Sequence, residues 1–157
     1  MIMDRIQADL MEILGTRATD VQVLSREAAN NLATMLRESF GNPKSKADPL
    51  WESLNYTDAY HAEEADAEVE RQVLGLQGPV HLLVDDWYGY SALKLLSGAQ
   101  LWYVLEKSYN FCWYATDDAV THLLCKNDHN VFLVCRDPTP KTNGTTVLEG
   151  TLRGPVQ

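Results

Sequence analysis

The chain has 157 residues and a mass of 17.7 kDa, the size of one ordinary globular domain. Its composition is 45% hydrophobic and 22% charged, with 9 Gly and 6 Pro, which excludes wholesale disorder, collagen and repeat architectures. The 13 basic and 22 acidic residues give a formal net charge of -9. This argues against nucleic acid as a partner, because phosphate contacts need a basic surface, and it favours a basic protein partner.

Nothing in the sequence predicts secretion or a membrane span. The first residues include an acid and no long apolar run, unlike a signal peptide, and no stretch approaches ~20 apolar residues. The three cysteines stand among apolar residues, and their odd number is typical of reduced thiols. We therefore expect a cytoplasmic protein without a cofactor.

Apolar residues at helical spacing predict helices in the first half of the chain. The expected ranges are 3–14, 26–40, a short helix after Asp48-Pro49, and 62–74, the last with an acidic outer face. Ser25 is the expected N-cap of the second helix, and Gly41 its left-handed C-terminal cap. Residues 55–61 fit either a strand or a loop.

The second half predicts a sheet with one inserted helix. Strands are expected at 80–84, 111–116, 121–126 and 131–136, with 90–96 as strand or helix and 147–152 as an edge strand. Ser97 and Gln100 fit a capping box that opens a helix from about Ala99 to Tyr109. Turn-forming residues join the last three main strands, which predicts a three-stranded meander.

Tight turns set the expected register of this meander. Thr116 would face Thr121, and Lys126 would face Val131. One face would then carry Cys112, Tyr114, Leu123, Cys125, Phe132 and Val134, and the other Trp113, Leu124, Leu133 and Cys135 around His122. Both faces are apolar, so we expect further layers to cover each.

The predicted fold is α+β in a single domain, residues 1–157. N-terminal helices pack on a mostly antiparallel sheet of four to six strands with a C-terminal three-stranded meander. Residues 1–78 form a mainly helical part, residues 79–152 the sheet-forming part, and residues 153–157 a frayed tail.

No catalytic motif stands out from the sequence. Four possible zinc ligands lie close together in the chain, His122, Cys125, His129 and Cys135, but their spacing differs from that of paired zinc knuckles. The register makes Cys135 and His122 the one candidate nucleophile and base, a pair that packing explains equally well. We interpret the thiols as core residues, with neither metal nor disulfide.

Asp85-Asp86 at the end of a buried strand is the most enzyme-like feature. Such carboxylates can hold magnesium, and Asp117-Asp118 could approach from another loop. A hydrolase would normally add a lysine or histidine nearby, and none is evident. The plain interpretation is a charged strand end and two turns.

The same segment predicts a protein-contact surface. Asp85, Asp86, Trp87, Tyr88 and Tyr90 place three aromatic and two acidic side chains within six residues. Tyr and Trp dominate interface hot spots, and the acids would attract a basic partner. The alternative is that Trp87 and Tyr90 fold back into the core.

Residues 80 to 136 also carry a motif-level resemblance. Val84-Asp85-Asp86-Trp87, the run Phe111–Asp117 and the run Leu123–Asn130 together resemble a "FYxTD…LLCxNxHD" pattern of small bacterial proteins, among them immunity proteins of polymorphic and contact-dependent toxin systems. The chain departs from the pattern at Lys126 and Asn130, where acids are common. The resemblance implies an acidic protein that binds a toxin domain, either plugging its active site or locking it from outside.

The expected function is therefore that of a cytoplasmic immunity protein that binds and neutralises a cognate, basic bacterial toxin domain. The central contacts would be residues 85, 86, 87, 88 and 90, and the rim would be Asp117, Asp118 and Asp128. The alternatives are a metal-dependent hydrolase that uses Asp85 and Asp86, and an adaptor protein unrelated to toxins. The sequence does not fix the oligomeric state.

Overall fold

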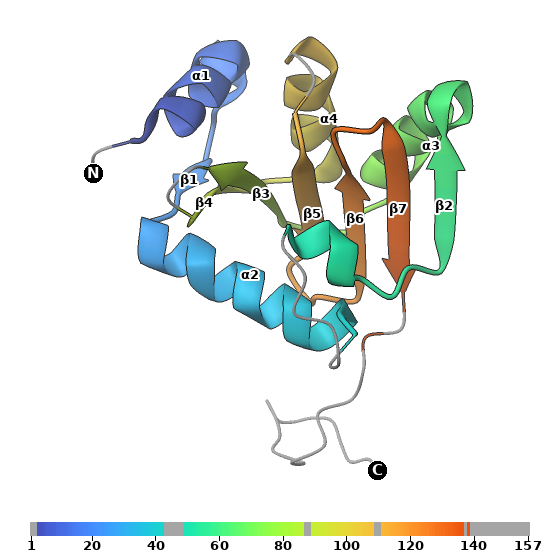
Figure 1. The fold of residues 1–157 in the computed structure, drawn as a ribbon. Helices are drawn as coiled ribbons and strands as arrows, with labels where there is room; N and C mark the ends of the chain where they lie inside the picture. The colour runs from blue at the N-terminus through green and yellow to red at the C-terminus, as the bar shows by residue number, and fades with distance from the viewer. Residues whose placement is uncertain (1–2, 43–48, 87–88, 109–110, 137, 139–157) are drawn as a thin grey trace.

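The computed structural model describes residues 3–42, 49–86, 89–108, 111–136 and 138 (Figure 1). The strands are β1 (Gln22–Val23), β2 (Asp58–His61), β3 (Val80–Asp86), β4 (Gly89–Leu95), β5 (Trp113–Asp117), β6 (His122–Lys126) and β7 (Val131–Arg136). The helices are α1 (Arg5–Leu14), α2 (Arg26–Phe40), α3 (Ala62–Leu74) and α4 (Gly98–Lys107), with short 3-10 turns η1 (Gly15–Arg17) and η2 (Leu50–Ser53).

Within these residues, seven strands form one antiparallel sheet in the order β1-β4-β3-β5-β6-β7-β2. The α+β class and the consecutive β5-β6-β7 meander are confirmed. The expected four to six strands are too few, because β1 and β2 from the first half of the chain form the two edges. These edges contain only two and four residues, too short for an alternating pattern to stand out. The expected strand at 147–152 lies outside the described residues.

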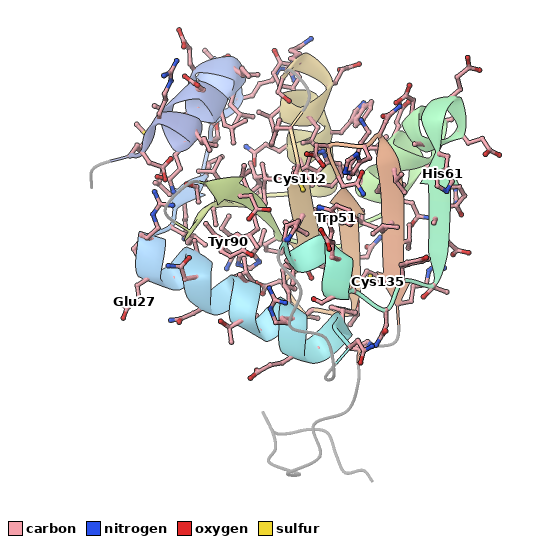
Figure 2. The ribbon with its side chains drawn as sticks, in the orientation of Figure 1. Glu27, Trp51, His61, Tyr90, Cys112 and Cys135 are labelled. Atoms are coloured by element: carbon pink, nitrogen blue, oxygen red, sulfur yellow. The ribbon has the colours of Figure 1, made fainter. Side chains whose placement is uncertain are left out.

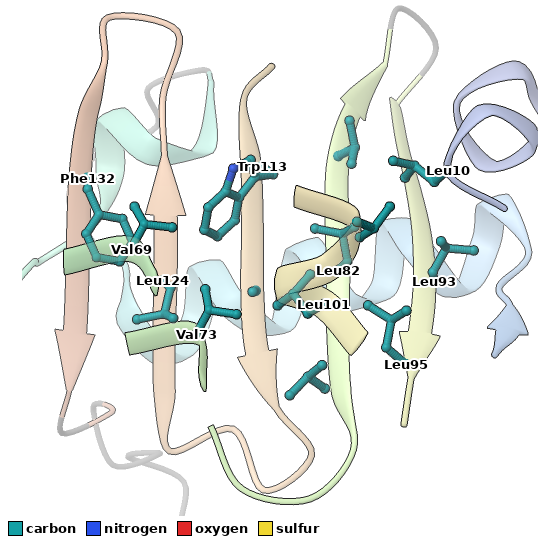
Figure 3. Close-up of a cluster of buried hydrophobic side chains, with 14 of the residues drawn as sticks. Leu10, Val69, Val73, Leu82, Leu93, Leu95, Leu101, Trp113, Leu124 and Phe132 are labelled. Atoms are coloured by element: carbon teal, nitrogen blue, oxygen red, sulfur yellow. The ribbon is translucent and has the colours of Figure 1, made fainter. Parts of the chain in front are cut away.

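Both faces of the sheet are covered, as the two apolar faces of its strands require. Helices α1, α3 and α4 pack on one face over a core that includes Leu82, Leu93, Leu101, Trp113 and Phe132 (Figure 3). Helix α2 and the turn η2 cover the other face, whose core includes Leu36, Leu83, Tyr114, Leu123 and Leu133. No helix in the described part of the chain has both the length and the apolar character that a membrane span requires.

Side-chain caps mark where α1, α2 and α4 begin. The Asp4 carboxylate accepts the Gln7 N–H at 2.9 Å and the Gln7 side chain accepts the Asp4 N–H at 3.1 Å, a complete capping box at α1. Ser25 accepts the Ala28 N–H at 3.1 Å and so caps α2 as predicted. At α4, Ser97 accepts the Gln100 N–H.

The predicted left-handed cap at Gly41 is wrong. Gly41 has φ -87 and ψ 160, an extended conformation. The chain leaves α2 to form an isolated antiparallel bridge between Gly41 and Leu54, next to a 2.8 Å hydrogen bond from the Asn55 N–H to the Phe40 carbonyl. A tertiary pairing therefore replaces the local cap.

The predicted register between β5 and β6 is wrong by two residues. Thr116 pairs with Leu123 rather than with Thr121. The turn is longer than expected, and the Asp117 carboxylate closes it by accepting the backbone N–H groups of Thr121 and His122. A shift of two residues keeps every side chain on its predicted face.

The register between β6 and β7 is wrong by one residue, which has a larger effect. Asn127 closes a three-residue loop: its side-chain oxygen accepts the N–H groups of His129 (2.9 Å) and Val131 (3.1 Å). Asn130 takes φ 60, the left-handed position that such loops require and that asparagine tolerates. Lys126 consequently faces Phe132 instead of Val131.

This shift exchanges the two faces of β7 relative to the prediction. Phe132 and Val134 lie on the face covered by α3 and α4, and Leu133 and Cys135 lie on the face covered by α2, the reverse of the prediction. His122 alternates with Leu123 and so occupies the face opposite to Cys135. The predicted Cys135–His122 pair is therefore wrong.

The end of α3 lies against the start of α4, where Gly98 meets Val73. A Cβ atom built on Gly98 would lie 2.2 Å from the Val73 carbonyl oxygen. Gly98 is buried at the first position of α4, so the backbone of α3 leaves no room for any side chain there. Glycine at this position therefore permits the close contact between the two helices.

Gly98→Ala is expected to destabilise the protein by about 1–3 kcal/mol, because one of the two backbones must move. Chemical denaturation measures the free energy of unfolding. The control is Ala99→Ser, a change at the next position of α4, where the side chain is exposed. It should shift the free energy of unfolding by only a few tenths of a kcal/mol. Equal stability of Gly98→Ala and the wild type would contradict the close packing.

Candidate partner-binding surface

The register brings one end of the sheet together from distant parts of the chain. We call it the hairpin end: residues 85–86 and 89–90 of the β3–β4 hairpin, residues 111–112 before β5, and the turn 127–130. The end of β2 at His61 pairs with Val131 and places the start of α3 here as well. Figure 2 labels Cys112 and His61 at this end.

Asp85 lies at the hairpin end, half-buried on the α2 face of β3. Its Oδ2 is 3.4 Å from the hydroxyl of Tyr114, and that hydroxyl also accepts a hydrogen bond from the backbone N–H of Trp51 at 3.1 Å. Burial raises the pKa of Tyr114 well above its ordinary value, with the charges of the neighbouring thiols and Asp85 adding to the effect. The phenol therefore stays protonated and can donate to Asp85. Asp85 thus also ties the turn end of the hairpin to β5.

Tyr90 pairs with Asp85 and is half-buried against the core beneath α2 (Figure 2). Its N–H donates to Asn30 at 3.0 Å, and its carbonyl accepts from the Arg26 guanidinium at 3.0 Å. The start of the second hairpin strand is therefore held by α2. Only part of Tyr90 is available for a partner.

The remaining hairpin residues are only partly described. Trp87 and Tyr88 lie outside the described residues, as does the side chain of Asp86, whose backbone ends β3. Their role in binding stays a prediction.

Asp128 is more exposed than Asp85, the other predicted acid at the hairpin end whose side chain is described. Its side chain is 70% exposed, and its Oδ1 lies 3.7 Å from Nε2 of His129. The His129 and Trp51 rings form a T-shaped pair, with ring centroids 5.7 Å apart. Trp51 thus belongs to this end, which the sequence did not indicate because η2 is remote from the turn in the chain.

The structure separates Asp117 and Asp118 from the other predicted contacts. Asp117 pairs with Val80, at the opposite end of β3 from the hairpin. At roughly 3.4 Å per residue, the two ends of that strand are about 20 Å apart. Asp118 is exposed there and pairs with Lys94 at 3.5 Å. The predicted site therefore divides between two ends of the sheet.

Asp117 is buried, and its carboxylate serves the β5–β6 turn. Burial raises its pKa, but hydrogen bonds from the Thr121 hydroxyl and from the N–H groups of His122 and Thr121 outweigh burial, so the pKa lies below its ordinary value. The ionised Asp117 carboxylate stabilises the fold fully above the unfolded-state pKa of ~3.9. This stabilisation is lost as the pH falls through the lower folded-state pKa.

Asp117→Asn is expected to destabilise the protein by about 1–3 kcal/mol at neutral pH, because the turn loses a charged acceptor. Thermal melts between pH 7 and pH 2.5 test it: the gap in Tm between wild type and variant should narrow below about pH 4. A gap that stays constant would mean that ionisation of this carboxyl does not stabilise the fold.

The thiols are packing residues in this structure. Cys125 and Cys135 are buried, and all three cysteines are unbridged. Burial raises the pKa of Cys135 to about 12, and burial together with Cys112 raises that of Cys125. Both buried thiols are therefore protonated at neutral pH. Among the described residues, no group of three or more His, Cys, Asp or Glu side chains is arranged to hold a metal ion.

Comparison of the chain with protein-family models, with curated proteins and with solved structures gives no match in any of the three.

Proposed function

We propose that the protein is an acidic, cytoplasmic immunity protein that binds a basic protein partner, a bacterial toxin domain, and neutralises it. The hairpin end is the contact surface. The observation that carries the proposal is the gathering of acidic and aromatic side chains at this end from separate elements of the fold.

The charges at the hairpin end favour a basic partner. Its described acidic side chains include Asp85, Asp128 and, at the start of α3, Glu63, Glu64 and Asp66. Lys126 lies among them at the end of β6. This acidic excess matches the sign of the net charge and would speed association with a basic domain.

Long-range hydrogen bonds brace the scaffold beneath this surface. Gln7 donates from one side-chain amide to the carbonyls of Leu24 (2.8 Å) and Ala92 (2.9 Å), tying α1 to the sheet beside the hairpin. Arg26 adds a 3.6 Å ion pair with Asp4 to its bond with Tyr90. A preorganised surface binds tightly because little conformational entropy is lost on association.

Affinity capture of the tagged protein from its native cells, with mass spectrometry of the eluate, identifies the partner. The proposal expects one stoichiometric basic protein whose toxic activity falls when the complex forms. A stable partner without such activity would favour the adaptor alternative and contradict immunity.

Two matched variants test which end of the sheet binds. Asp128→Asn at the hairpin end should lower the association rate constant roughly twofold or more at low salt, because a steering charge is lost. Asp118→Asn is the control: it removes the same charge from an exposed position at the opposite end and should leave the rate unchanged. Surface plasmon resonance with the captured partner measures both rates, and the reverse pattern would assign binding to the opposite end.

A further inference from the structure

A groove of about 560 Å³ opens between α3 and α4 beside the hairpin end. Its apolar lining comes from Val69, Trp102, Leu105, Phe111 and Trp113, and its polar lining from Asp66, Glu106, Ser108, Lys126 and Asn130. The volume falls within the ~300–1,000 Å³ of typical ligand pockets. The groove can therefore hold more than one side chain of a partner.

The packing of the two helices explains why the groove lies at this end. The helices meet at Gly98 and Val73, the start of α4 and the end of α3. Toward the hairpin end the groove lies between them, and Trp113 of β5 is part of its lining. Figure 3 shows the Trp113 ring at this end of the core, between Val69 of α3 and Leu101 of α4.

Two carboxylates stand on opposite walls of this groove. Asp66 comes from α3 and Glu106 from α4, and both are exposed. Glu63 and Glu70 lie three residues before and four residues after Asp66, so they extend the same acidic stripe of α3. Lys126 supplies the positive charge in the lining, leaving an acidic excess.

Other cations of the two helices are engaged elsewhere. Arg71 forms its ion pair with Glu68. Lys107 lies over the ring of Tyr103, with its Nζ 4.8 Å from the centroid. The acidic walls are therefore not neutralised by these neighbours.

We propose that the groove binds an arginine side chain, with an adjacent apolar residue, from a segment of a basic protein partner. A guanidinium stacks on aromatic rings such as those of Trp102 and Phe111 and pairs with carboxylates through its planar fork of donors. The more strongly hydrated ammonium of lysine fits an aromatic-lined groove less well. The apolar neighbour occupies the floor over Trp113.

This inference deepens the proposed function, and rests on it in assigning the arginine to a protein partner. The groove is continuous with the hairpin end, because Phe111 and Asn130 belong both to the hairpin end and to the lining of the groove. One partner can therefore contact the hairpin end and place an arginine in the groove.

Capped dipeptides test the groove without the partner. N-acetyl-Leu-Arg-methylamide is titrated into the protein, and NMR follows the indole N–H signals of the four tryptophans. Saturable shifts of the Trp102 and Trp113 signals are expected, with at least about tenfold weaker binding of the citrulline analogue, which has similar shape but no charge. Equal binding of citrulline, of the lysine analogue or of free arginine would overturn the proposal, as would the absence of a saturable shift.

Asp66→Asn and Glu106→Gln should each weaken the dipeptide several-fold and leave the melting temperature unchanged, because both side chains are exposed. Glu12→Gln, an exposed change on α1, is the control and should have no effect. Dipeptide affinity that is unchanged in the double variant would overturn the acidic walls as the recognition element.

The double variant also separates the two proposals. If it loses the dipeptide and still binds the captured partner with wild-type affinity, the partner does not use the groove and the present inference fails while the proposed function stands. If the wild type binds the dipeptide but no basic partner is captured, the proposed function fails.

Discussion

The structure depends on one constraint: the central strands of the sheet are apolar on both faces, so both faces must be covered. In β3, Leu82 and Val84 point to one side and Leu83 to the other, and all three are buried. The chain meets this requirement with α2 and η2 on one face and with α1, α3 and α4 on the other. Because both faces are occupied by packing, the faces of the sheet are closed to a partner, and the ends of the sheet stay accessible.

The two ends of the sheet are built differently. At one end, Asp117 closes the β5–β6 turn with its buried carboxylate, and Arg136 pairs with Asp58 at 2.7 Å. Polar groups there bond to one another within the fold. At the hairpin end, acidic side chains from several elements surround partly buried aromatic rings, and the α3–α4 groove adds apolar surface. The acidic excess and the aromatic rings at the hairpin end are the physical basis on which we propose partner binding there.

Much of the fold could be predicted from the sequence because its signals are local. The range 62–74 was predicted for α3 and 131–136 for β7, and the structure has the same bounds. Capping by Ser25 and by Ser97 was also predictable, since it involves residues three apart. The edge strands β1 and β2 were not, because strands this short depend on the neighbour they pair with.

The strand register between β6 and β7 could not be predicted from local patterns alone. Assigning Asn127 to the strand rather than to the turn changes the loop by one residue and turns every side chain of β7 over. The candidate site was predicted in part for the same reason. Asp85 and Asp128 share an end of the sheet although they are remote in sequence, whereas Asp118 belongs to the opposite end. Trp51, Trp102 and Phe111 gave no local sign of lying near the hairpin, because tertiary packing alone brings them there.

The assignment of binding to the hairpin end is tested most directly by hydrogen–deuterium exchange of the protein alone and in complex with its captured partner. We expect slower exchange on binding in the turn 127–130, in the first turns of α3 and around the β3–β4 hairpin, with no change in the turn 117–121. Slower exchange confined to the turn 117–121 or to the outer face of α2 would contradict it.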